Sequence, residues 1–147
     1  MKKLHPLAFF AAAALVSSFA FAQNTPVGKW HTVDDKTKEI KSEITITESG
    51  GALSGKVSQI LRKDAKPDAV CEECKDARKG KPMLGLEIIR GGKKEADADV
   101  WTGGKILDPE NGKEYTLKMT PEDGGKKLAV RGSIGPFGRT QTWVRVE

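Results

Sequence analysis

The two cysteines of the 147-residue chain, Cys71 and Cys74, are separated by two residues. A CxxC pair can form a disulfide, act as a redox-active thiol pair or supply two ligands to a metal ion. Glu72 and Glu73 stand between the two thiols and oppose thiolate formation, although cationic residues follow them. The pair is therefore the first candidate for chemistry, with three alternatives open.

The residues that would complete a reactive site around these thiols are missing nearby. A zinc site needs about four ligands, and His31 is the one histidine outside the N-terminal segment. Lys75 follows Cys74, where a c-type haem motif needs histidine. A Ser-His-Asp set would also have to use His31, and the sequence has no nucleophile-elbow motif. We therefore predict no catalytic residues, no metal and no cofactor, and a protein that is not an enzyme.

The N-terminus has the pattern of a secretory signal peptide. Lys2 and Lys3 precede an almost unbroken apolar run, residues 7–21, which ends in the A-x-A pattern Ala20-Phe21-Ala22. We expect residues 1–22 to be removed after Ala22, and residues 23–147 to form one periplasmic or secreted domain. No later apolar run approaches the length of about 20 residues that a spanning helix needs, so no integral membrane anchor is expected.

Export favours a disulfide between Cys71 and Cys74, because such proteins meet an oxidising compartment. A ring this small constrains the unfolded chain little, so the bridge would mainly hold its own loop. The alternative function is an envelope protein that handles thiols or metals through Cys71 and Cys74.

The charge distribution argues against a nucleic-acid partner. The net charge is +5, but the lysines are scattered among aspartates and glutamates, and no basic stripe alternates with aromatic residues. A solvated surface of mixed charge is expected instead.

The elements that must carry the cysteines are short β-strands separated by turns. Period-two alternation and Gly, Asn, Asp and Pro clusters about every ten residues predict about eight strands in an antiparallel barrel or sandwich, with no sustained helical periodicity. The Cys segment interrupts this pattern as a long polar loop, Asp64–Lys81. Residues 83–89 after it are apolar on both faces, and we predict that they form the most buried strand. The other expected strands lie near residues 28–33, 43–47, 53–61, 99–107, 115–119, 128–132 and 139–146.

The first and last strands resemble those of lipocalins. Gly28-Lys29-Trp30 matches the GxW of the first lipocalin strand, and Arg145 stands near the end of the last strand. In that family the tryptophan packs across one end of the barrel and the arginine covers its ring. The resemblance implies that Trp30 and Arg145 pack together at the barrel end.

A longer set of motifs resembles one family of exported bacterial proteins, domain of unknown function 2147. The motifs follow the cysteine pair in this order: Lys81-Pro82-Met83-Leu84-Gly85-Leu86, residues 101–115, Leu128-Ala129-Val130-Arg131-Gly132 and Thr140-Gln141-Thr142-Trp143-Val144-Arg145. The resemblance covers nearly all of residues 23–147. It implies an all-β, single up-and-down barrel of the lipocalin type with suspected binding of apolar ligands, and it implies no reaction.

On this basis we predict non-enzymatic binding of a small apolar or amphipathic ligand inside the barrel. Candidate wall residues are the apolar positions of the expected central strands: Leu84, Leu86, Ile88, Trp101, Tyr115 and Leu117. A third possibility is a module for protein–protein interaction that presents the Asp64–Lys81 loop to a partner, since long loops on rigid scaffolds often carry recognition.

Overall fold

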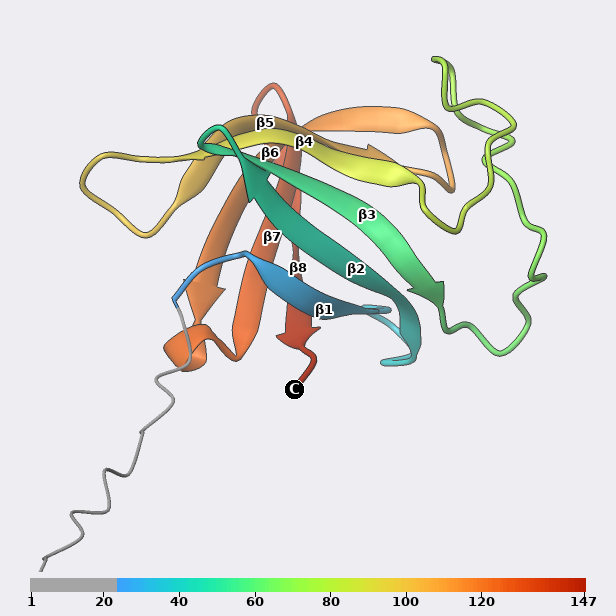
Figure 1. Ribbon diagram of the computed structural model, residues 1–147, viewed down its shortest axis with the longest axis horizontal. Helices are drawn as coiled ribbons and strands as arrows, with labels where there is room; N and C mark the ends of the chain where they lie inside the picture. Colours follow the sequence, from blue (N-terminus) through green and yellow to red (C-terminus); the bar gives the residue numbers. More distant parts are fainter. Residues whose placement is uncertain (1–23) are drawn as a thin grey trace, which may run out of the picture.

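The computed structural model describes residues 24–147, which form eight antiparallel strands (Figure 1). The predicted signal peptide and its cleavage site lie outside the described residues. The strands are β1 (Gly28–Val33), β2 (Ile40–Ser49), β3 (Ala52–Ile60), β4 (Glu87–Lys94), β5 (Trp101–Asp108), β6 (Lys113–Glu122), β7 (Lys127–Ile134) and β8 (Phe137–Arg145). A short 3-10 helix, η1 (Asp123–Gly125), joins β6 to β7.

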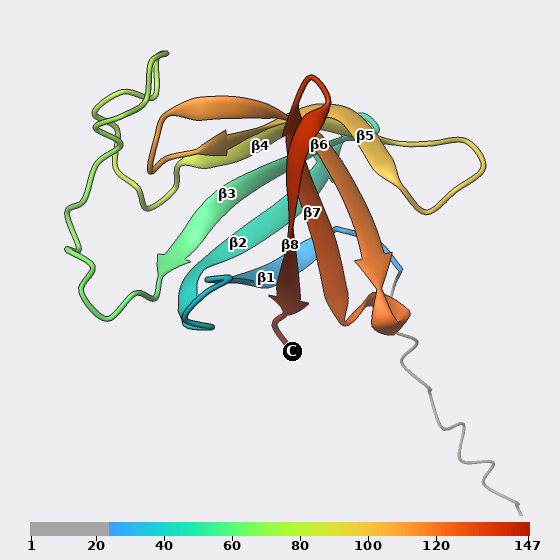
Figure 2. The same cartoon turned by 180° about the vertical axis from the view of Figure 1, so that it is seen from behind.

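The strands form a closed up-and-down barrel, as predicted. Each strand pairs with its neighbour in the sequence, and β8 returns to pair with β1 at Trp30–Arg145 and His31–Val144 (Figure 2). Closure leaves no unpaired strand edge, which removes the main route to edge-to-edge aggregation. Within the described chain, no helix is long and apolar enough to cross a membrane.

Alternation along the strands sends one set of apolar side chains inward. In β2, Ile44 and Ile46 are buried, while Thr45 between them is only half-buried. Trp30 of β1 and Leu53 of β3 join the same core, as do Met119 and Leu128 of β6 and β7. The period of two in the sequence therefore becomes an apolar interior and a polar exterior.

The predicted strand over residues 83–89 is wrong in its first half, because β4 begins only at Glu87. Met83 accepts a hydrogen bond from the backbone N–H of Leu86 (3.1 Å), which closes a turn. Gly85 in this turn has a φ of +86°, outside the range of an extended strand. The run Met83–Leu86 therefore belongs to the long loop, and its apolar character reflects packing of Met83 and Leu86 against the core.

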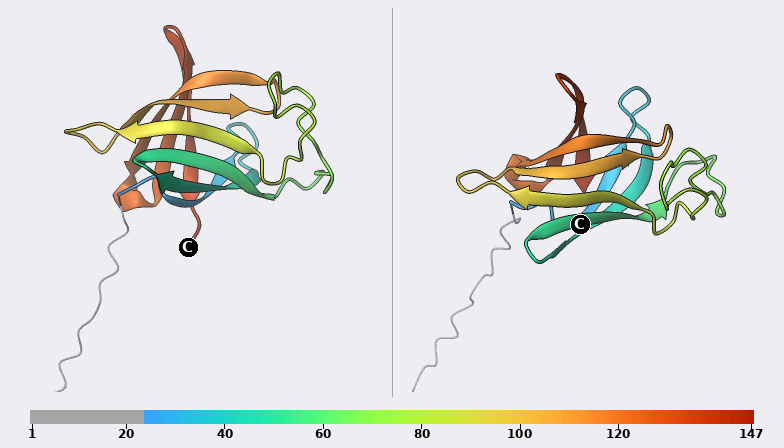
Figure 3. Two further views of the ribbon diagram at one scale, coloured as in Figure 1. Left: turned by 45° about the horizontal axis from the view of Figure 1, so that its top comes forward. Right: turned by 90° about the horizontal axis from the view of Figure 1, so that it is seen from above.

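The turns divide between two ends of the barrel (Figure 3). One end, described below as the open end, carries the connections β1–β2, β5–β6 and β7–β8 together with the long β3–β4 loop that holds the cysteines. The other end carries the β2–β3 and β4–β5 turns, η1 and the last residues of the chain. In Figure 3 the β4–β5 turn and the cysteine loop project in opposite directions. The cysteine loop and the β4–β5 turn therefore belong to opposite ends of the barrel.

Candidate functional site

One end of the barrel is closed by Trp30. Its ring is completely buried, and its Nε1 donates a hydrogen bond to the carbonyl of Pro26 at 2.7 Å. The guanidinium carbon of Arg145 lies 4.2 Å from the centre of the indole ring, within the range of a cation–π contact. This is the packing that the lipocalin resemblance implies.

Arg145 also ties the N-terminal segment to the last turn. Its Nε donates to the carbonyl of Gly125 at 2.6 Å, and its two terminal nitrogens donate to the carbonyls of Val27 at 3.0 Å and Thr25 at 2.6 Å. Burial lowers the pKa of Arg145, although the guanidinium stays charged at any physiological pH. A planar donor group suits this position because it reaches several carbonyls while it covers the ring.

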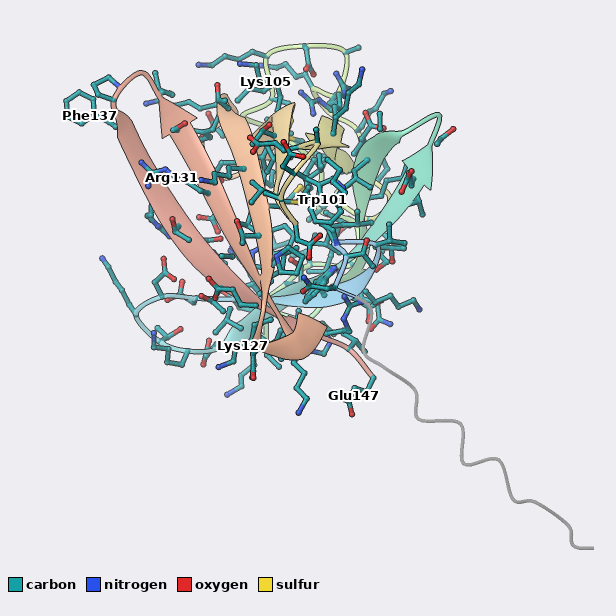
Figure 4. The ribbon with its side chains drawn as sticks, turned by 90° about the vertical axis from the view of Figure 1, so that its left-hand side faces the viewer. Trp101, Lys105, Lys127, Arg131, Phe137 and Glu147 are labelled. Carbon is teal, nitrogen blue, oxygen red and sulfur yellow. A yellow bond between two sulfur atoms is a disulfide. The ribbon has the colours of Figure 1, made fainter. Side chains whose placement is uncertain are left out.

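The open end leads into a cavity of about 690 Å³. Its deeper wall is apolar and comes from six strands: Ile44, Val57, Ile88, Ile106, Val130 and Trp143. Its mouth is charged: Lys41, Arg62, Asp64, Asp108, Glu110, Lys113 and Arg139. Residues 134 and 137, at the tip of the β7–β8 hairpin, also line it, and Phe137 is 80% exposed there. Figure 4 shows Phe137 at this tip and Lys127 at the opposite end of β7.

Two of the six predicted wall residues, Ile88 and Tyr115, line this cavity. Leu86, Trp101 and Leu117 are buried in the core but do not contribute to the cavity wall. Leu84 is 55% exposed in the turn before β4, so its predicted place in a central strand is wrong. Whether any of these residues binds a ligand stays a prediction.

The sequence reasoning missed the charged mouth and most of the apolar wall. The wall residues alternate with polar ones in β2 and β3, so alternation was an available signal. Trp30 marks one end as closed, and in an up-and-down barrel this fixes which half of each strand faces the open end. Trp101 begins β5 at the closed end, so this argument could have excluded it.

Cys71 and Cys74 form the predicted disulfide, with an S–S distance of 1.96 Å. Both residues are 1% exposed. Backbone hydrogen bonds from Cys71 N to Lys81 O and from Gly80 N to Cys71 O, each 2.8 Å, close the loop around them. In this state neither sulfur is a free thiol or an open metal ligand. The bridge therefore acts as a local staple in the loop.

Arg78 fastens the stapled loop to the barrel. Its side chain is 5% exposed, and it donates to the carbonyl of Glu87 at the start of β4 (2.9 Å). It also pairs with Asp76 in the loop and with Glu114 in β6. Burial of a guanidinium is tolerated because each side of the fork meets an acceptor. One side chain thus connects the loop to two separate strands.

Acid is expected to loosen this attachment. The hydrogen bonds from Arg78 hold the pKa of Asp76 well below its usual range. A carboxyl whose pKa is lowered in the folded state stabilises that state above its ordinary pKa of about 4, and the contribution disappears as the pH falls below that value. We therefore expect Asp76→Asn to be less stable than the unmodified protein at pH 7, and the gap to narrow progressively below about pH 4.

Urea unfolding of both proteins from pH 7 to pH 2 would measure that gap. Asp68→Asn is the matched control, because Asp68 lies in the same loop and is exposed; it should follow the unmodified protein at every pH. A gap for Asp76→Asn that stays constant with pH would contradict the expectation.

A second polar cluster lies around Glu43 on β2. Glu43 is 4% exposed and accepts a hydrogen bond from Ser58 at 2.8 Å, while His31 Nε2 lies 3.8 Å from its other oxygen. The carboxylate stands between the hydroxyl and the imidazole, so this is not the order of a Ser-His-Asp triad. Across residues 24–147, no three side chains of His, Cys, Asp and Glu gather in an arrangement that could hold a metal ion.

Comparison with solved structures relates the barrel to one protein of known fold. Protein HP1028 from the human pathogen Helicobacter pylori, described as belonging to the lipocalin family, superposes with a TM-score of 0.71 at 18% sequence identity. The alignment covers 85% of each chain. At this identity the likeness establishes a lipocalin-like fold. A search of curated proteins gives no match.

The family comparison agrees with the motifs in the sequence. The model for a family described as "Uncharacterized protein conserved in bacteria (DUF2147)" matches residues 28–145, from the first residue of β1 to the last residue of β8. This match spans the whole barrel, including the cysteine loop and the Trp30–Arg145 end. The chain therefore belongs to the DUF2147 family of bacterial proteins, and it has a lipocalin-like barrel.

Proposed function

We propose that this protein is a non-enzymatic binding protein of the bacterial cell envelope, which holds a small apolar or amphipathic molecule in its barrel. The observation that carries the proposal is the cavity of about 690 Å³ behind the open end. Its volume falls within the range of about 300–1,000 Å³ that is common for small-molecule sites. Envelope location rests on the signal-peptide pattern before Gln23.

The distribution of residues in the cavity supports this type of ligand. The deep wall is formed by aliphatic side chains and Trp143, so an apolar group that enters it leaves water. The charged residues are confined to the mouth, where a polar group of the ligand would stay hydrated or paired. An eight-stranded barrel is wide enough to enclose one small ligand.

Native mass spectrometry of the protein purified from its own cell envelope tests the proposal. We expect a retained small molecule, and we expect Ile106→Trp to weaken its retention at least about tenfold, because the larger side chain fills the apolar wall. Val144→Trp is the matched control, since Val144 is exposed on β8 and does not line the cavity; it should retain the molecule.

Circular dichroism of both variants would separate loss of binding from loss of fold. If the folded protein retains no molecule, or if Ile106→Trp retains it as well as Val144→Trp does, the cavity is not the binding site.

A further inference from the structure

Two cations and one carboxylate meet at the mouth of the cavity. Lys41 Nζ lies 2.9 Å from Oε1 of Glu110, and Nη2 of Arg62 contacts the same oxygen. All three residues line the cavity. One carboxylate oxygen of Glu110 thus faces two positive charges, and Oδ2 of Asp34 lies farther from Lys41, at 3.8 Å.

Backbone hydrogen bonds fix the positions from which the two cationic side chains extend. The carbonyl of Lys41 accepts hydrogen bonds from the N–H groups of Leu61 (2.9 Å) and Arg62 (3.1 Å). These bonds join the start of β2 to the end of β3, so both side chains begin from fixed positions at one side of the mouth. Glu110 comes from the β5–β6 turn, and its side chain is 51% exposed. Its carboxylate is therefore the member of the trio that can most easily give way.

The other charged groups near the trio have partners of their own. Asp34 pairs with Lys41 through its Oδ2 at 3.8 Å, while its Oδ1 accepts two backbone N–H groups within its own loop. Asp108 accepts a backbone N–H and a side-chain amide of its own turn. Arg139 pairs with Asp35 at 2.6 Å. Asp64 and Lys113 also line the mouth and carry opposite charges.

Lys41 is a partly buried cation beside a second cation. Burial, and next the charge of Arg62, lower the pKa of Lys41, although Asp34 and Asp108 act in the opposite direction. An anionic group beside these two cations favours the charged form of Lys41. An incoming anionic head group that replaces the carboxylate of Glu110 would therefore keep Lys41 and Arg62 paired.

From this geometry we infer that Glu110 stands where the head group of the ligand binds, and that the ligand is a single-chain amphiphile with an anionic head group. Lys41 and Arg62 bind the head group after Glu110 moves aside, and the chain lies along the apolar wall at Ile44, Val57 and Ile106. This inference rests on the proposed function, because it specifies the class of ligand that the same cavity takes. In the structure, Glu110 bridges the mouth through the two cations.

Isothermal titration calorimetry with three probes of equal chain length tests the inference: decanoate, 1-decanol and decyltrimethylammonium. We expect decanoate to bind at least about tenfold more tightly than 1-decanol, since hydrogen bonds to charged groups contribute this much or more. Lys41→Met and Arg62→Gln should each weaken decanoate about tenfold and leave 1-decanol unchanged. Glu110→Gln should strengthen decanoate binding, because it removes the competing carboxylate.

Lys118→Met is the matched control for loss of one positive charge, since Lys118 is exposed on β6 and does not line the cavity; it should bind decanoate like the unmodified protein. Equal affinity for decanoate and 1-decanol, tighter binding of decyltrimethylammonium, or a Glu110→Gln variant that binds decanoate more weakly would overturn the inference while the proposed function stands. If none of the three probes binds to the folded protein, the proposed function fails and the inference fails with it.

Discussion

Replacing Trp30 by alanine is expected to lower the free energy of unfolding by about 3 to 5 kcal/mol, the range for removal of a buried aromatic side chain. Trp30 is completely buried at the closed end of the barrel. The substitution removes the ring that Arg145 covers and the hydrogen bond to the carbonyl of Pro26. Urea unfolding followed by circular dichroism measures the change directly.

Two further variants show which interaction is responsible. Trp30→Phe keeps an aromatic ring and loses the Nε1 donor, so its effect should be smaller than that of Trp30→Ala. Val144→Ala changes an exposed residue of the adjoining β8, and it should stay within about 0.5 kcal/mol of the unmodified protein. If Trp30→Ala were as stable as Val144→Ala, the closed end would not contribute to stability in the way that its burial indicates.

Replacing Gly112 by alanine is expected to cost about 2 to 5 kcal/mol. Gly112 lies in the β5–β6 turn with a φ of +72°, where a side chain adds about 1 to 2 kcal/mol of strain. A Cβ at this position would also stand 1.8 Å from the carbonyl oxygen of Glu73. The cysteine loop packs directly on this turn, so it would have to move away, with an overpacking cost of about 1 to 3 kcal/mol.

Gly135→Ala provides the matched control for this prediction. Gly135 has a φ of +56°, but a Cβ there would meet nothing within 4 Å. It should therefore carry only the backbone strain, and the difference between the two variants measures the contact with the loop. Limited proteolysis should cut residues 63–81 faster in Gly112→Ala than in Gly135→Ala. Equal stability and equal cleavage would show that the loop does not depend on this contact.

These two substitutions address opposite ends of the barrel. Loss of the closed end at Trp30 should destabilise the whole fold, because β1 and β8 complete the barrel there. Loss of the contact at Gly112 should act on the loop beside the mouth, whose residues Asp64, Ala65, Ala69 and Met83 line the cavity. The first change therefore tests the scaffold, and the second tests the wall that the loop adds to the cavity.

Much of the fold was predictable because it depends on local patterns. Alternation in segments such as Glu43–Thr47 predicted strands, and turn residues marked their ends, so the count of eight strands is confirmed. The pattern alone left barrel and sandwich open. Gly28-Lys29-Trp30, shared with lipocalins, and the later motifs shared with the DUF2147 family indicated the barrel, and the closed strand order confirms it.

The clearest error, the strand predicted over residues 83–89, has a physical cause. Residues 83–89 are apolar on both faces, as a buried strand is, but this pattern does not include the effect of Gly85 on the backbone. Its positive φ turns the chain before β4 begins. Leu86 still reaches the core, whereas Leu84 points to solvent, because the turn sends the two side chains in different directions.

For the cysteine pair, too, part of the structure was predictable from the sequence and part was not. The sequence by itself determined that Cys71 and Cys74 were close enough to bridge, and that acidic neighbours and the absence of nearby histidine disfavoured other chemistry. Only the tertiary structure decided that both sulfurs are buried and that Arg78 links their loop to β4 and β6. Contacts between residues far apart in the chain have no local signature, so no pattern predicted this attachment.

For the protein as a whole, the sequence determined the fold class and the family, because strand alternation, turn residues and ordered motifs are properties of neighbouring residues. It favoured the disulfide without excluding the other roles of the cysteine pair. Only the tertiary structure decided where the cavity lies and what lines its mouth. Lys41, Arg62 and Glu110 come from three separated segments, and their charges meet only when the barrel closes. The proposed head-group site therefore could not be found by reading the chain in order.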